Sequence, residues 1–176
     1  MIARDMAAAA VSMAEAQAYA RVETGEEEAL LAGLVRSACA LCEAFTGQVL
    51  VVRGCVEVIA ATSEWQRLTL NPVRSIDMVE AVAADGSAVA LAVADYAVDI
   101  DARGDGWVRI VGTVVGRIRV SGQAGMASDA NGVPEPLRQG ILRLVAHLFA
   151  TRDSGGGEPP AAVTAMWRPY RRMRLA

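Results

Sequence analysis

Lysine is absent from this sequence, because all 17 of its basic residues are arginine. The absence excludes lysine Schiff-base chemistry and phosphate-binding P-loops, both of which need the lysine amine. Apolar runs that could cross a membrane are also missing, since none approaches the roughly 18 residues required. The first ten residues include Asp5 and are too weakly apolar for a secretory signal. We therefore expect a cytoplasmic protein that makes no membrane contact.

Aromatic residues are scarce at 5%, although hydrophobic residues fill 53% of the 176 positions. Many of these are alanine, so we expect an aliphatic core, and the length fits one domain. Cysteine is also rare, with Cys39, Cys42 and Cys55. The first two have the CxxC spacing of metal and redox sites, but no second CxxC or histidine pair completes a tetrahedral set. We predict three buried free thiols and no metal site.

Groups that could support catalysis are few. His147, the single histidine, falls in the middle of an expected helix, and no GxSxG nucleophile motif occurs. Asp99, Asp101 and Asp105 are spaced as at the start of a calcium-binding loop, but such a loop would put an arginine and an isoleucine at ligand positions. We expect a solvated turn there. The sequence predicts no enzyme and no catalytic, cofactor or metal site; an enzyme that uses Asp99, Asp101 or His147 is the alternative.

One amphipathic helix, predicted over residues 133–152, organises the chain. Pro134 and Pro136 suit its first turn, and apolar residues then recur every three or four positions. Gly140 lies in its middle, where glycine costs about 1 kcal/mol relative to alanine. The glycine therefore indicates a place where another group packs closely.

Two further helices are predicted near the N-terminus. The first covers residues 12–21 and begins with a capping box made by Ser12 and Glu15. The second covers residues 26–45 and ends at a Thr-Gly pair. Its apolar face needs a partner, and the helix at 133–152 is the expected one.

From residue 49 the apolar pattern changes to a period of two. Strands are predicted over 49–59, 64–70, 74–83, 89–93, 96–100, 107–111 and 114–121, with a register fault within 74–83 and a polar loop over 122–132. Asp85-Gly86 predicts a hairpin turn. Since helices and strands are segregated, the predicted fold class is α+β: two N-terminal helices and one C-terminal helix form a small bundle, with an antiparallel meander of short strands between them and an extended C-terminal tail.

The C-terminal stretch has a composition of its own. Residues 153–162 are rich in glycine and proline and predict a flexible linker. Residues 163–176 contain four arginines and no acid, a charge of +4, so the rest of a chain of net charge −3 carries −7. Arginine and aromatic residues dominate interface hot spots. We therefore predict a docking tail that orders on binding, with the partner-binding residues Met166, Trp167, Arg168, Tyr170, Arg171 and Arg172. The alternative is that Trp167 and Tyr170 fold back onto the chain's own sheet.

Several short motifs follow one another in a fixed order between residues 11 and 152. They are the Phe-Thr-Gly of 45–47, the LNPVRSI of 70–76, an Asp-Gly turn, the DYAVD of 95–99, the IRVSGQAG of 118–125 and the proline-initiated helix ending in LVAH. This order resembles that of the head–tail connector (adaptor) proteins of tailed bacteriophages and gene transfer agents. Asn71 and Met126 depart from the family's pattern, where a proline and an aromatic residue are usual.

The resemblance implies a structural role in a virion or gene transfer agent particle. Such proteins are made in the bacterial cytoplasm and form a ring, expected to be dodecameric, at the head–tail junction. The implied partners are the portal protein, the next tail component (a stopper or tail terminator) and DNA that passes through the ring without specific contacts. The family's C-terminal segment commonly reaches toward the portal. On this basis the chain divides into a connector domain at 1–152, a linker at 153–162 and a docking tail at 163–176. The alternative function is a small cytoplasmic binding or regulatory protein whose tail docks an acidic partner.

Overall fold

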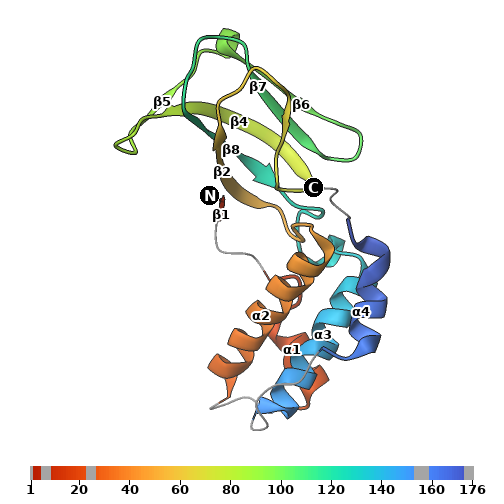
Figure 1. Ribbon diagram of the computed structural model, residues 1–176. Coiled ribbons are helices and arrows are strands. Elements are labelled where there is room, and N and C mark those ends of the chain that lie inside the picture. The colour runs from red at the N-terminus through yellow and green to blue at the C-terminus, as the bar shows by residue number, and fades with distance from the viewer. Residues whose placement is uncertain (1, 5–8, 23–26, 153–158, 173–176) are drawn as a thin grey trace. The chain divides into compact units, whose positions relative to one another are not determined.

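The computed structural model describes residues 2–4, 9–22, 27–152 and 159–172 and divides the chain into two compact units (Figure 1). The β unit comprises Met1–Ala7 and Val52–Met126, and the helical unit comprises Ala8–Val51 and Ala127–Ala176. This division differs from the predicted one. The strand-rich segment is a unit of its own, inserted between two halves of the helical unit, and the C-terminal segment belongs to the helical unit.

Within the described part of the helical unit there are four helices: α1 (Met13–Ala20), α2 (Glu28–Thr46), α3 (Glu135–Ala150) and α4 (Ala161–Trp167), with the short 3-10 turns η2 (Ala130–Gly132) and η4 (Arg168–Tyr170). The predicted capping box starts α1, since the Glu15 backbone N–H donates to Ser12 Oγ at 3.2 Å and the Ser12 N–H donates to Glu15 Oε2 at 2.8 Å. Gly47 ends α2 in the left-handed conformation, as a C-terminal glycine commonly does.

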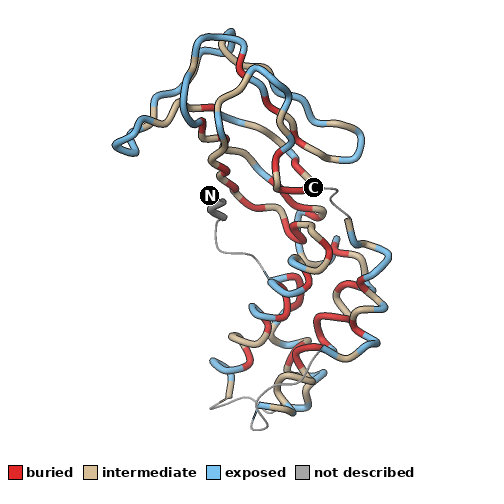
Figure 2. Tube along the Cα trace, viewed as in Figure 1, coloured by how far each residue is buried: buried red, intermediate tan, exposed pale blue. Residues whose placement is uncertain are grey.

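The helix α3 is the centre of this unit, because it packs against α1, α2 and α4. The predicted pairing of the second helix with α3 is thus confirmed. Buried residues recur at one-turn intervals along both helices, as Figure 2 shows; they include Leu31, Val35 and Ala38 of α2 and Leu137, Ile141 and Leu144 of α3. The sequence pattern therefore placed the core of the helical unit correctly.

By length and composition alone, α2 could cross a membrane, since it has 19 residues and a mean hydropathy of 1.5. We had expected no apolar segment long enough to cross a membrane, and by these two measures α2 is such a segment. The same helix buries one side and exposes Arg36 and Ser37 on another, and it packs on α3. These are the properties of a core helix in a bundle.

The described residues of the β unit form eight antiparallel strands: β1 (Ile2–Arg4), β2 (Arg53–Ala60), β3 (Gln66–Arg67), β4 (Val73–Val82), β5 (Ala88–Ala90), β6 (Tyr96–Ile100), β7 (Gly106–Ile110) and β8 (Arg117–Ala124), with the 3-10 turn η1 (Val93–Asp95) before β6. They form a five-stranded sheet in the order β1-β2-β8-β4-β5 and a three-stranded sheet in the order β3-β7-β6. Both sheets contribute to one aliphatic core, which includes Val79, Val108, Ile118 and Val120.

The strand β8 runs further than predicted, because Gly122–Ala124 pair with both neighbouring strands instead of starting a loop. At Gly122 a Cβ would lie 2.1 Å from the Ser75 carbonyl oxygen, so glycine allows β4 to approach this closely. Two register shifts in β4, next to Ser75 and before Met78, confirm the predicted irregularity. The strand β1 was not predicted.

Candidate interaction surface at the C-terminal segment

The tail begins as a helix and not as an extended peptide. Pro160 precedes α4, and the alanine-rich sequence that follows favours a helix. Val163 and Trp167 are one turn apart and therefore share one face of α4, where they are 0% and 2% exposed. The α4 helix packs against α3 and also touches α2 (Figure 1). This buried face fixes the segment to the helical unit.

The indole of Trp167 is the main anchor. Its Nε1–H donates to the Leu137 carbonyl oxygen of α3 at 3.3 Å, and its ring lies against Phe45 of α2 with 5.9 Å between ring centroids. The indole rests directly on Gly140, where a Cβ would lie 2.1 Å from Trp167 Nε1. The glycine was predicted to mark close packing, and the structure confirms this and identifies the packing group as a tail residue.

After Trp167 the chain stays attached to the C-terminal end of α2. Gln48 Nε2 donates to the Tyr170 carbonyl oxygen at 2.6 Å, and the Arg172 N–H donates to the Thr46 carbonyl oxygen at 2.8 Å. The Arg171 guanidinium lies 5.5 Å from the Phe45 ring centroid, within the range of a cation–π interaction. Residues 160–172 are therefore docked on their own helical bundle.

This arrangement corrects part of the predicted docking tail. Trp167 is not an open side chain, and it folds back onto helices of its own unit, whereas the alternative had placed it on the sheet. Arg168 and Arg171 are exposed, and Met166, Tyr170 and Arg172 are half-buried. Partner binding by these residues stays a prediction, and residues 173–176 of the predicted tail lie outside the described part of the chain. Two signals for the helix were present in the sequence: the alanines after Pro160 and the unexplained glycine in α3.

The three cysteines are buried and free, as predicted. Burial raises the pKa of the Cys42 thiol strongly, and the neighbouring Cys39 and Glu43 add to this effect. Deprotonation to the reactive thiolate is therefore disfavoured. No group of three or more potential metal ligands occurs among the described residues.

The acidic turn and the histidine show no shared site. Asp101 Oδ1 accepts the backbone N–H groups of Arg103 and Asp105 at 2.8 and 3.0 Å, which confirms the predicted turn. The bond from Asp105 is the largest cause that holds the pKa of Asp101 below its usual value. His147 Nε2 is buried and has no hydrogen-bond partner within the described part of the chain. Asp99 and Asp101 belong to the β unit, and His147 belongs to the helical unit.

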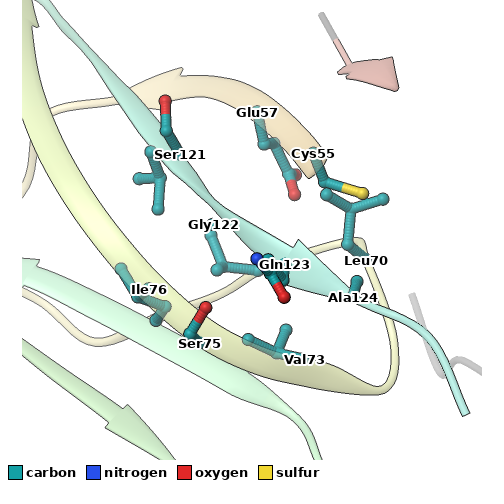
Figure 3. Close-up of a pocket in the computed structure, with 12 residues that line it drawn as sticks. Cys55, Glu57, Leu70, Val73, Ser75, Ile76, Ser121, Gly122, Gln123 and Ala124 are labelled. Atoms are coloured by element: carbon teal, nitrogen blue, oxygen red, sulfur yellow. The ribbon is translucent and has the colours of Figure 1, made fainter. Parts of the chain in front are cut away.

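A small cavity of about 10 Å³ lies between β2, β4 and β8 (Figure 3). Its polar lining includes Glu57, Ser75 and Gln123. The Glu57 carboxylate is buried and accepts the Thr69 backbone N–H at 2.8 Å and also the Thr69 hydroxyl. A space of this size holds about one water molecule. The cavity is thus too small for a cofactor.

Comparison with known proteins gives a clear answer for the fold. No protein-family model and no curated protein matches the chain. A chain in the neck of an empty gene transfer agent (GTA) particle, a structure computed with C6 symmetry, matches with a TM-score of 0.79 and 23% identity over 100% of this chain and 97% of the other. A chain in the virion of a native GTA particle gives 0.77 and 24%, and one in the neck of a native GTA particle with C12 symmetry gives 0.74 and 22%, each with the same coverage. The α+β fold of this chain is therefore that of chains from GTA particles and their necks, as the order of its motifs predicted.

Proposed function

We propose that this protein is a structural subunit of the neck of a GTA or tailed-phage particle, at the junction of head and tail. The observation that carries the proposal is the extent of the fold match, because it covers all of this chain and 97% of the neck chain. The role is one of assembly and not of catalysis.

The subunits form a ring in this proposal. The C6 and C12 symmetries of the neighbouring neck structures support self-association around a closed circle. A dodecamer agrees with both, since a twelve-fold ring also has six-fold symmetry. The ring binds the portal protein on one side and the next tail component, a stopper or tail terminator, on the other. DNA passes through it, and the net charge of −3 disfavours lasting contact with the phosphates.

The exposed side of the C-terminal segment is the docking surface. Arg168 and Arg171 are exposed, and the hydrogen bonds from Gln48 to Tyr170 and from Trp167 to Leu137 hold the segment in place. Preorganised arginines lose less entropy on binding than those of an unstructured peptide. We assign Met166, Arg168, Tyr170, Arg171 and Arg172 to contacts with the portal or a neighbouring subunit, while Trp167 anchors the segment from behind.

The test is a pull-down with tagged full-length chain from a lysate of particle-producing cells, with the portal identified by mass spectrometry. The variant Arg168→Glu/Arg171→Glu is compared with Arg36→Glu/Arg143→Glu, which reverses two exposed arginines elsewhere on the helices. The result of a truncation after Pro160 would be harder to interpret, because it also removes the Trp167 side chain that packs on Gly140 and Phe45. We expect the wild type and the control to recover the portal and the first variant to lose it. Equal recovery by both variants would remove the docking surface but keep the neck role, and no portal with any form would refute the neck role.

A further inference from the structure

The three-stranded sheet of the β unit presents two tryptophans away from the core. Val108 and Ile110 of β7 point to the core and are 0% and 3% exposed, so the intervening residues Trp107 and Arg109 lie on the opposite face. Trp107 pairs with Arg67 of β3 and with Asp99 of β6, and Trp65 precedes β3 on the same side as Arg67. We call this the tryptophan face; its residues are Trp65, Arg67, Asp99, Trp107 and Arg109.

Trp65, Asp99 and Trp107 line a shallow cleft of about 270 Å³ on this face. Trp65 is 43% exposed, although large aromatic side chains are usually placed where they bury more of their surface. Trp107 is half-buried, and no tryptophan among the described residues of the helical unit is as exposed as Trp65. Tryptophan is one of the residues most enriched at the centre of protein interfaces, so the face has the composition of an unoccupied contact.

One carboxylate in the lining of the cleft, that of Asp99, can pair with an incoming guanidinium. Arg109 already stacks on Trp65, with its guanidinium carbon 4.9 Å from the ring centroid, so the geometry accepts this group. Arg67 is paired with Asp105 at 3.7 Å. Asp99 is exposed and forms no ion pair with a described residue. An incoming arginine would therefore meet the Trp107 ring and an available carboxylate at once.

We propose that the tryptophan face binds Arg168 of a second copy of this chain, and this inference rests on the proposed ring. Arg168 is exposed on η4, a turn with Pro169 in its first positions and Trp167 buried directly before it. The tryptophan face belongs to the β unit, with Asp99 as its available carboxylate, and the η4 turn belongs to the helical unit. Such a head-to-tail contact repeats until a ring closes. Single-stranded nucleic acid also stacks on aromatic rings, but the Asp99 carboxylate in the lining of the cleft would repel its phosphates.

Charge reversal with rescue tests this pairing on the full chain. Self-association is measured by sedimentation velocity over a range of protein concentrations. We expect Asp99→Arg and Arg168→Asp each to weaken it about tenfold, and the combined variant to restore it to within about threefold of wild type, because the two reversed charges again attract. Matched controls are Asp77→Arg and Arg143→Asp, which reverse exposed charges of the β4 strand and of α3 and should leave self-association unchanged.

Three results would overturn the inference. One is a combined variant that self-associates as weakly as the single variants. Another is a wild-type chain that remains monomeric at every concentration. The third is a Trp65→Ala variant that self-associates normally but no longer binds a single-stranded oligonucleotide that the wild type binds. If the portal is recovered in the pull-down while rescue fails, the neck role stands and only this pairing is wrong. If rescue succeeds while no portal is recovered, the chain self-associates without a neck role.

Discussion

Replacing Gly140 by alanine tests whether the Trp167 indole packs directly on this glycine. A change from glycine to alanine within a helix usually stabilises a protein, and here it should destabilise it. In the middle of a helix, glycine to alanine stabilises by about 1 kcal/mol through backbone entropy and propensity. At Gly140 the new methyl carbon would lie 2.1 Å from Trp167 Nε1 and 2.8 Å from its Cδ1. These distances are far below van der Waals contact, so the indole or the helix α4 must move.

The magnitude follows from two opposing contributions. Overpacking of a tight core costs about 1–3 kcal/mol, and complete loss of a buried tryptophan costs about 3–5 kcal/mol. Because a Cβ at 2.1 Å is a severe overlap that leaves the indole partly buried, we place the cost between these ranges, at about 2–4 kcal/mol. Subtracting the helix gain of about 1 kcal/mol leaves a net destabilisation of about 1–3 kcal/mol. The matched control is Gly33→Ala in α2, where the nearest atom to the new carbon is Arg36 Nη2 at 3.9 Å. There we expect the ordinary stabilisation.

The assay is urea unfolding followed by the far-ultraviolet circular dichroism of the helices. A double-mutant cycle adds Trp167→Ala and the combined variant. In the Trp167→Ala background, Gly140→Ala should become neutral or stabilising, because no indole remains to be displaced. If Gly140→Ala stabilises the wild-type protein as much as Gly33→Ala does, the Trp167 indole does not pack on Gly140 in the way described.

Three further outcomes can be measured on the isolated chain. Hydrogen bonds from the backbone and hydroxyl of Ser12, with the charge of Arg138 as a smaller cause, hold the pKa of Glu15 below 4.5. The stability that this lowered pKa contributes is present above pH 4.5 and is lost as the pH falls below it. Ser12→Ala should therefore lower the urea midpoint at neutral pH and flatten this pH dependence, and an unchanged profile would contradict the role of Ser12 as a cap. The buried thiols, including Cys42 with its raised pKa, should not react with a thiol reagent at neutral pH until the protein is unfolded, and labelling of native protein seen by mass spectrometry would be evidence against this burial. Gly122→Ala should destabilise the β unit by about 2 kcal/mol or more, since its Cβ meets the fixed backbone oxygen of Ser75; a urea midpoint equal to that of wild type would show that β4 does not approach this closely.

Local patterns were sufficient to predict most of the helical unit. The capping box at Ser12 and the apolar spacing of α2 and α3 depend on residues within a few turns of one another, so sequence alone carries them. The turn at Asp85-Gly86 was predicted for the same reason, because Gly86 adopts φ +88° and the turn joins β4 to β5. In each case the signal and the structure that it determines are close in the chain.

The features that were missed depend on contacts between distant residues. The end of β8 was misplaced because Gly122 was interpreted as a loop signal, whereas it is explained by the backbone of Ser75, 47 positions earlier. The position of Trp167 depends on Leu137, Gly140 and Phe45, which no local pattern links to it. The exposed Trp65 and the half-buried Trp107 share one surface only through the pairing of β3 with β7. Whether a tryptophan anchors its own chain or lies on the surface depends on its burial, which only the assembled fold determines.

The most direct test of the neck role is a cryo-electron microscopy reconstruction of the neck in particles from cells that produce this chain. We expect a closed ring of copies with this fold between the portal and the tail, with Arg168 of each copy against Trp107 of the next. Complete necks in which no density fits this fold, obtained from cells that express the chain, would contradict it.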